Sequence, residues 1–371
     1  MKVALVHDHF LEFGGAERVV VSLKNIYPDA DVYTSYYDPR RLGKHAKLLE
    51  KWNIRTSWAD RVWGMKRLHS PLRFVYPWIW ESFDFSDYDL VISSSATSMS
   101  RGIITRPDTL HISYVHHPPR YLYGYETARE WRKHWPIRVY AHLINFGLRS
   151  WDYDAAQRPD YLIANSHETA LRIKKFYDRE STVIYPPVTI PKDEPGTQAK
   201  TDYYITTSRL ARAKHIDILI RACNQLELPL RIIGSGRDLE RLRVLAGPTI
   251  EFLTDLDDPA RDKQLAGAKG FLFASRDEDF GIAPVEAMGY GVPVIAYGSG
   301  GLLETVKPGK NGLLYDELTV ESLARAIAKY ERLSAREIKS MRQSARKMSK
   351  TYSQQEFAAQ ITSFVKKYIG S

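Results

Sequence analysis

Short apolar runs alternate with helix-like runs along the whole chain, and the alternation starts a second time in the C-terminal half. In the first half the apolar runs cover residues 3–6, 32–35, 90–93, 110–115 and 161–164. In the second half they cover residues 203–207, 230–233, 250–253, 270–274 and 292–296. Strands that alternate with helices favour a parallel sheet with helices on both faces. The pattern therefore predicts two doubly wound α/β domains, for which 371 residues are sufficient.

The two halves are separated by segments 185–188 and 191–197, which are rich in turn formers and poor in apolar residues. We place the first domain at residues 1–195 and the second at 196–350. Residues 351–371 have the pattern of a final amphipathic helix, with Ser353 and Glu356 at the spacing of a capping box.

Positive charge is concentrated in one span of the first half. Of the net charge of +9, residues 40–73 carry +8, because they hold ten Lys and Arg residues against Glu50 and Asp60. All eight tryptophans lie between Trp52 and Trp151. A basic, tryptophan-rich region favours contact with a membrane interface or another anionic partner, unless it is an ordinary solvated face. It contains no nucleic-acid recognition motif, which argues against nucleic-acid binding.

Few features indicate the compartment. The single Cys223 lies in a helix-like apolar run and predicts a buried structural thiol and a reducing environment. The first apolar run is too short for a signal peptide, and no run approaches the roughly 20 apolar residues of a spanning helix. We expect a cytoplasmic protein, either free or attached peripherally to the cytoplasmic face of the inner membrane.

The strongest chemical pattern is a pair of glutamates, Glu278 and Glu286, that follows the apolar run 270–274. Glycine between them and a helix beginning near Pro284 would let backbone amides approach an anion. Glu286 on the opening turn has the geometry to accept from ribose hydroxyls. Glu278 lies at the carboxyl end of a strand, where open α/β sheets bind their ligands. In isolation, both glutamates are also compatible with a merely structural role.

Cationic and glycine-rich patterns follow other strands. Arg209 and Lys214 lie just after residues 203–207, where they would clamp a diphosphate. The turn Gly234-Ser235-Gly236 follows residues 230–233, although such a turn alone is weak evidence. In the first half, Gly14 and Gly15 follow the first strand, and His116 and His117 follow residues 110–115. Each of these is compatible with an ordinary strand-to-helix turn or a structural histidine.

Several other chemistries lack support. The sequence has no GxxxxGK[ST] loop and no GxSxG elbow. Of the acid pairs with DxD spacing, only Asp277 and Asp279 lie near the other motifs, so no metal site is assigned.

Taken together, these residues resemble glycosyltransferase family 4, a group of retaining enzymes with the GT-B fold. Gly14 to Glu17 is similar to the family's N-terminal glycine loop, and Arg209 with Lys214 to its pair for the donor diphosphate. The turn 234–236 resembles its GxG turn, and Glu278 to Glu286 its EX7E signature. His215 and Asp279 stand where the family usually has glycine. The resemblance implies two Rossmann-like domains facing across a cleft, with the final helix crossing back to the N-terminal domain.

The resemblance also implies roles for individual residues. Arg209 and Lys214 would hold the donor phosphates, Glu278 the hexose hydroxyls and Glu286 the ribose. Backbone amides near Phe280, Gly281 and Ile282 would contact the sugar or diphosphate, and Gly14, Gly15 and Gly234 would line the donor site. His117 would lie near the reactive face of the sugar. Such enzymes need no metal or other cofactor and use no protein nucleophile.

Residues 114–121 resemble a segment of bacterial mannosyltransferases of polysaccharide and O-antigen assembly, which favours GDP-mannose as donor. The acceptor would be a glycan or a polyprenyl-diphosphate-linked saccharide. Candidate acceptor or membrane contacts are Arg120, Tyr121, Arg41, Lys44, Lys66 and Arg67. The alternatives are a UDP-sugar-dependent transferase of the same family, a nucleotide-sugar epimerase and a non-catalytic scaffold or sugar-binding subunit.

Overall fold

The computed structural model describes residues 1–127, 135–191, 202–254 and 256–369. The chain divides into two compact units. The N-terminal unit comprises Met1–Pro187 with Gln355–Ser371, and the C-terminal unit comprises Val188–Gln354. The following paragraphs treat each unit by itself.

The N-terminal unit is built on a seven-stranded sheet whose strands are all parallel, in the order β3-β2-β1-β4-β5-β6-β7. The strands are β1 Val3–His7, β2 Asp31–Thr34, β3 Ile54–Thr56, β4 Leu90–Ser95, β5 Leu110–Val115, β6 Tyr161–Ala164 and β7 Thr182–Val183. Side chains of β1 alternate between two cores, because Leu5 packs into one hydrophobic cluster while Ala4 and Val6 pack into another. Both faces of the sheet are therefore covered, as the continuous apolar runs predicted.

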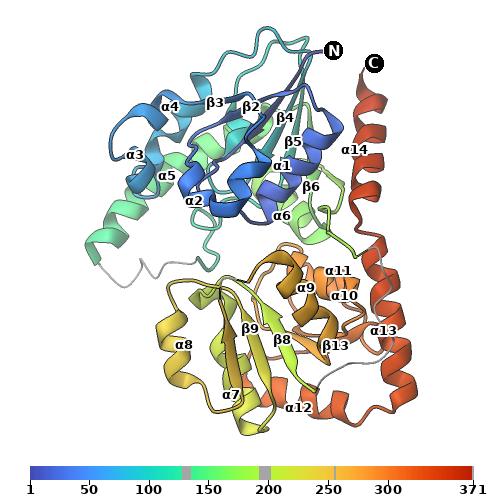
Figure 1. Ribbon diagram of the computed structural model, residues 1–371. Helices are drawn as coiled ribbons and strands as arrows, with labels where there is room; N and C mark the ends of the chain where they lie inside the picture. The colour runs from blue at the N-terminus through green and yellow to red at the C-terminus, as the bar shows by residue number, and fades with distance from the viewer. Residues whose placement is uncertain (128–134, 192–201, 255, 370–371) are drawn as a thin grey trace. The chain divides into compact units, whose positions relative to one another are not determined.

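Helices of the N-terminal unit fill the connections between these strands (Figure 1). They are α1 Gly15–Ile26, α2 Pro39–Leu42, η1 Gly43–Leu48, η2 Trp58–Arg61, α3 Met65–Leu68, η3 Arg73–Val75, α4 Tyr76–Glu81, η4 Ser100–Gly102, α5 Trp135–Gln157 and α6 His167–Tyr177. Short helices occupy the basic span 40–73, and α5 is the longest of the described helices at 23 residues.

The C-terminal unit is built on a six-stranded parallel sheet in the order β10-β9-β8-β11-β12-β13. Its strands are β8 Tyr204–Thr207, β9 Leu230–Ile233, β10 Ile250–Leu253, β11 Gly270–Phe273, β12 Val294–Tyr297 and β13 Gly312–Tyr315. Its helices are η6 Arg212–Lys214, α7 Ile216–Gln225, α8 Leu239–Leu245, α9 Asp258–Gly267, α10 Ile282–Gly289, α11 Leu302–Thr305, α12 Val320–Glu331 and α13 Ala335–Lys350. The predicted doubly wound α/β fold is thus present in both units.

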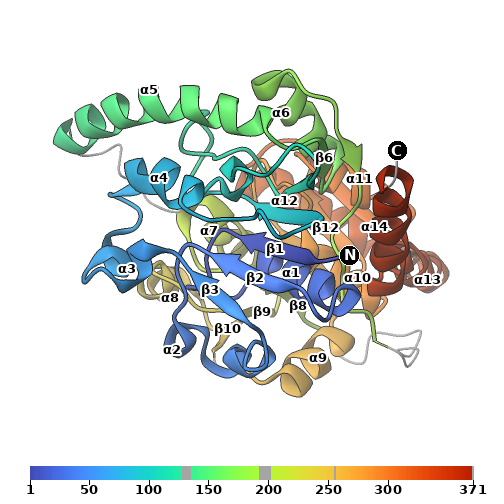
Figure 2. The ribbon, with the colours of Figure 1, turned by 90° about the horizontal axis from the view of Figure 1, so that it is seen from above.

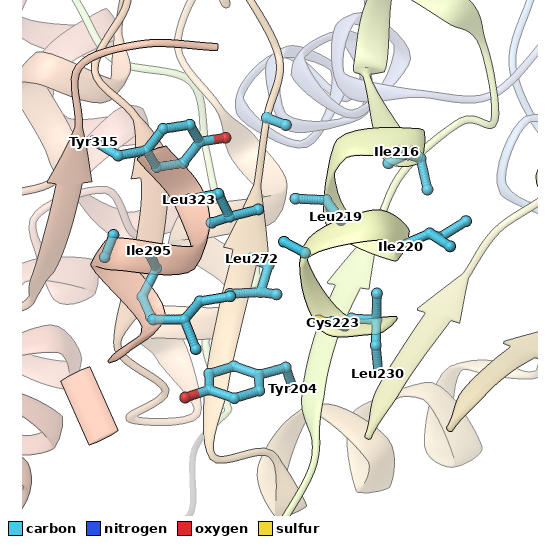
Figure 3. Close-up of a cluster of buried hydrophobic side chains, with 14 of the residues drawn as sticks. Tyr204, Ile216, Leu219, Ile220, Cys223, Leu230, Leu272, Ile295, Tyr315 and Leu323 are labelled. Carbon is cyan, nitrogen blue, oxygen red and sulfur yellow. The ribbon is translucent and has the colours of Figure 1, made fainter. Parts of the chain in front are cut away.

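One core of the C-terminal unit packs α7 and α12 against the sheet (Figure 3). Leu219 and Cys223 of α7 lie over Leu230 of β9 and Leu272 of β11, and Leu323 of α12 closes the cluster. Burial raises the pKa of the Cys223 thiol to about 12, so the thiol stays protonated and packs as a small apolar side chain.

The last helix, α14 (Gln354–Tyr368), belongs to the N-terminal unit (Figure 1). Its Phe357, Ile361 and Val365 join a core cluster of that unit, and Tyr368 stacks on Tyr161 with ring centroids 3.7 Å apart. This confirms the predicted return of the final helix. The boundary differs from the sequence estimate, because the chain divides after Pro187 rather than after residue 195. Residues 192–197 of the expected linker lie outside the described residues.

Candidate active site

A lysine and a glutamate 64 residues apart in sequence meet at the carboxyl ends of two central strands of the C-terminal sheet. Lys214 Nζ lies 2.6 Å from Glu278 Oε2 and 3.3 Å from Ser275 Oγ, and the Ser275 hydroxyl donates to the same carboxylate oxygen at 2.6 Å. The residues meet because Lys214 follows β8 and Glu278 follows its parallel neighbour β11. Both side chains remain accessible, at 28% and 18% exposure. The sequence had assigned Lys214 and Glu278 to separate parts of one donor, and their direct ion pair, like the contact with Ser275, was not predicted.

The loop that carries Glu278 rests on a second loop, which follows β12. Gly301 N–H donates to the Glu278 carbonyl at 2.8 Å, and Asp277 N–H donates to Ser299 Oγ at 3.1 Å. A Cβ on Gly300 would lie 2.3 Å from the Glu278 carbonyl oxygen, so glycine is required for this approach. Sequence reasoning missed residues 298–301, although a Gly-Ser-Gly-Gly run directly after a strand is a signal that could have revealed them.

The GxG turn supports the loop that carries Arg209. Gly234 has φ +142°, and a Cβ there would lie 2.0 Å from the Ser208 carbonyl oxygen. Leu210 N–H donates to the Ser235 carbonyl at 2.9 Å, which locks the two segments together. Arg209 itself is exposed. The structure thus accounts for Gly234 by backbone packing, and its contact with a donor stays a prediction.

His215 occupies a backbone position that suits glycine. It precedes α7 with φ +49°, in the left-handed region that non-glycine residues seldom adopt. The family resemblance placed a glycine at this position, and the observed angle gives the physical reason. The conformation turns the chain directly after Lys214.

Helix α10 begins at Ile282, so Pro284 lies in its first turn as predicted. Glu286 is the fifth helical residue and lies just beyond the opening turn on which it was expected. The side chain of Glu286 is buried, with 6% exposure. Burial lowers the pKa of Arg261 on α9, but the charges of Glu286 and Asp262 outweigh that effect and leave the pKa raised. Arg261 was not predicted as a partner of Glu286.

The residues between the two glutamates are held in place at the start of α10. Gly281 precedes the helix with φ +91°, and Phe280 is buried with its ring 5.1 Å from that of Tyr352. The first amide groups of a helix have no intrahelical acceptor, and the helix dipole favours an anion there. The amides at Ile282 and Ala283 are thus suited to an anionic group of a ligand.

In the N-terminal unit, the predicted glycine loop is connected to a network of buried polar side chains. Gly14 N–H donates to Glu17 Oε2 at 2.7 Å, and Glu17 Oε1 lies 3.4 Å from His7 Nε2. His7 Nδ1 lies 3.1 Å from Ser94 Oγ, which is 2.8 Å from His116 Nε2. Burial lowers the pKa of His116 to about 3, so that imidazole is neutral near pH 7. This hydrogen-bond network holds the glycine loop, through Gly14, at the carboxyl ends of β1, β4 and β5.

The remaining predicted residues of the N-terminal unit differ in accessibility. His117 is half-buried with Nδ1 2.9 Å from the Pro118 carbonyl, Arg120 is half-buried, and the Tyr121 hydroxyl donates to the Thr97 carbonyl at 3.2 Å. Arg41, Lys44 and Arg67 are exposed.

Lys66, by contrast, is bound within the fold. Its ammonium lies 3.0 Å from Asp60 Oδ1 and donates to the Tyr37 carbonyl at 2.8 Å. The prediction of Lys66 as a free membrane contact therefore needs correction, because this cation already has internal partners.

Comparison with known proteins places this geometry in a family. Residues 190–348, most of the C-terminal unit, match the model of glycosyl transferases group 1. The alpha-1,3/1,6-mannosyltransferase alg2 of Schizosaccharomyces pombe is 23% identical over 85% of this chain and 70% of its own length. The C-terminal unit thus matches glycosyl transferases group 1, and the chain is similar over most of its length to the alg2 mannosyltransferases. The match covers both glutamates, Arg209 and Lys214.

Two further relatives bear on this glycosyltransferase. The GDP-mannose-dependent monoacylated alpha-(1-6)-phosphatidylinositol monomannoside mannosyltransferase of Corynebacterium glutamicum is 36% identical over 155 residues, which cover 36% of this chain and 40% of that one. The structure of Anabaena Alr3699/HepE in complex with UDP and glucose has a TM-score of 0.71 at 20% identity, with 99% of both chains covered. The second likeness shows the GT-B fold.

Proposed function

We propose that this glycosyltransferase moves mannose from GDP-mannose to a glycan or a polyprenyl-diphosphate-linked saccharide in the synthesis of a cell-surface polysaccharide. The observation that carries the proposal is the accessible Lys214–Glu278 pair, 2.6 Å apart, in which Glu278 lies on a loop held by Ser299 and Gly301. A fixed ammonium group beside a fixed carboxylate suits a ligand that presents phosphate next to hydroxyl groups.

The cations act on the leaving group. Lys214 and Arg209 would bind the donor diphosphate and offset the charge that develops on it as the sugar departs. Because these cations and the start of α10 supply positive charge, we propose that no divalent metal and no other cofactor is required. Diphosphate binding would exchange one anionic partner of Lys214 for another, which frees Glu278 to accept from the hexose hydroxyls.

The choice of GDP-mannose rests on relatives. The alg2 protein is named a mannosyltransferase, and the C. glutamicum relative is named GDP-mannose-dependent. Glu286, held near Arg261, would accept from the ribose. The second candidate is a UDP-sugar donor, which the HepE complex with UDP and glucose favours.

The N-terminal unit would bind the acceptor. Gly14, held by Glu17, and Gly15 would allow close approach of the donor, and His117 would lie near the reactive face of the sugar. Arg120 and Tyr121 would contact the acceptor. We propose transfer with retention, in which the acceptor attacks the face that the diphosphate leaves and the donor phosphate takes the proton. No protein nucleophile is then required.

Calorimetric titration with GDP, UDP, ADP and their sugars, with and without EDTA, tests the donor assignment. We expect tightest binding of GDP and GDP-mannose, and no change on addition of EDTA. Tighter binding of UDP would contradict GDP-mannose and support the second candidate. Loss of binding in EDTA would contradict metal independence.

A further inference from the structure

Helix α5 has two apolar faces, of which only one is packed. Ala141, Leu148 and Ala155 are buried against the rest of the N-terminal unit. On the opposite side, Trp135, Val139, Leu143 and Phe146 follow one another at helical spacing and are 69%, 53%, 67% and 68% exposed. We call these four residues the α5 outer face. A run of four exposed apolar side chains on one helix face is typical of an interaction site rather than of an ordinary solvated surface.

The charge around the α5 outer face has a single sign. Residues 135–151 contain Arg138 and Arg149 but no Asp or Glu. The described part of the chain has no helix that is long and apolar enough to cross a membrane. An apolar helix face flanked by cations, on a helix that does not span, fits the plane of an anionic lipid interface.

A second exposed apolar group adjoins α5. In the segment 58–78, Trp63 is 98% exposed, Trp78 61%, Leu68 48% and Trp58 44%. Tryptophan is enriched at membrane–water interfaces, and the exposed Arg61 and Arg67 add positive charge to this segment.

Contacts fix this segment to α5. Arg73 Nη2 donates to Asn145 Oδ1 at 2.8 Å, and the Tyr140 hydroxyl donates to the Pro71 carbonyl. In both views α3, α4 and the first turns of α5 lie on the same side of the unit (Figures 1 and 2). Asn145 belongs to the packed face of α5, so these contacts hold the segment against the helix, and the two apolar groups lie on neighbouring elements of the N-terminal unit.

We propose that the α5 outer face, with the adjoining tryptophans, docks onto the surface of an anionic lipid bilayer. This inference deepens the proposed function, since a polyprenyl-linked acceptor is held at such a surface. It also extends the predicted contact from the basic span 40–73 to the start of α5.

Co-sedimentation of the full-length chain with vesicles tests the proposal. The vesicles are phosphatidylcholine alone, or an equal mixture of phosphatidylcholine and phosphatidylglycerol. We expect wild-type protein to bind the mixed vesicles more tightly, and Leu143→Ser/Phe146→Ser to weaken that binding at least about 10-fold, because two buried apolar side chains are lost. Replacing Arg61, Arg67 and Arg138 with Gln is expected to weaken it by roughly 5-fold per residue, and only on the anionic vesicles.

The matched control is Leu171→Ser/Val244→Ser, which removes two apolar side chains that are 67% and 86% exposed on α6 and α8. It is expected to bind like wild type. Equal binding of the α5 variant and wild type would overturn the proposal. A third outcome is that wild-type protein does not bind vesicles but forms an oligomer in sedimentation velocity, and that Leu143→Ser/Phe146→Ser dissociates this oligomer. The partner of the α5 outer face would then be a second copy of the chain, not a bilayer. The assay contains no nucleotide, so its failure is distinguishable from failure of the donor assignment.

Discussion

Replacing Lys214 with alanine is expected to lower kcat/KM for sugar transfer by at least about 10²-fold, the scale of losing one group that stabilises charge in the transition state. The ammonium lies 2.6 Å from Glu278 and 3.3 Å from Ser275, so its position is fixed before a donor binds. A fixed cation needs no rearrangement as negative charge builds up on the departing diphosphate, and this makes its loss costly.

Steady-state kinetics of Lys214→Ala should be compared with Lys310→Ala, which removes an exposed lysine from the same unit. The control is expected to retain wild-type rates. Thermal unfolding of both variants separates a folding defect from a catalytic one. A Lys214→Ala enzyme with near-normal kcat/KM would remove Lys214 from the proposed role.

Substitution of Gly300 by alanine is expected to lower kcat/KM by about 10²-fold, since misplacing a reacting group by about 1 Å costs that much. Gly300 has φ +59°, and a Cβ there would lie 2.3 Å from the Glu278 carbonyl oxygen. That contact is with backbone, so the loop carrying Glu278 has to move. Gly300 itself is not proposed to contact the donor or the acceptor.

Gly309→Ala is the matched control for this substitution. Gly309 has φ +76° but nothing within 4 Å of the added Cβ, so it introduces similar backbone strain without the clash. Kinetics and thermal unfolding of both variants should be measured together. If Gly300→Ala and Gly309→Ala lose activity equally, backbone strain rather than displacement of Glu278 explains the loss.

The sequence placed Lys214 and Glu278 at strand ends of one parallel sheet, although it did not predict that they form an ion pair. Lys214 and Glu278 each follow a strand, and β8 and β11 proved to be neighbours. It did not reveal the support by Gly300 and Gly301, because such close packing depends on where two loops meet in space.

Other features were hidden for different reasons. The polar chain from His116 through Ser94 to His7 joins three strands, and no short-range spacing encodes it. The α5 outer face could not be distinguished from core, since apolar residues at helical spacing usually predict burial. The unit boundary was placed too late, because the turn-forming composition continues beyond Pro187, where the chain passes into the C-terminal unit.

The central claim is that this chain transfers mannose from GDP-mannose with retention. Its most direct test is to incubate the full-length enzyme with radiolabelled GDP-mannose and polyprenyl-diphosphate-linked saccharides in EDTA, and to identify the anomer of the product by NMR. The account predicts an α-linked mannose in the lipid-linked fraction, with transfer greatly reduced by Lys214→Ala. Binding of GDP-mannose without transfer to any such acceptor, or a β-linked product, would contradict it.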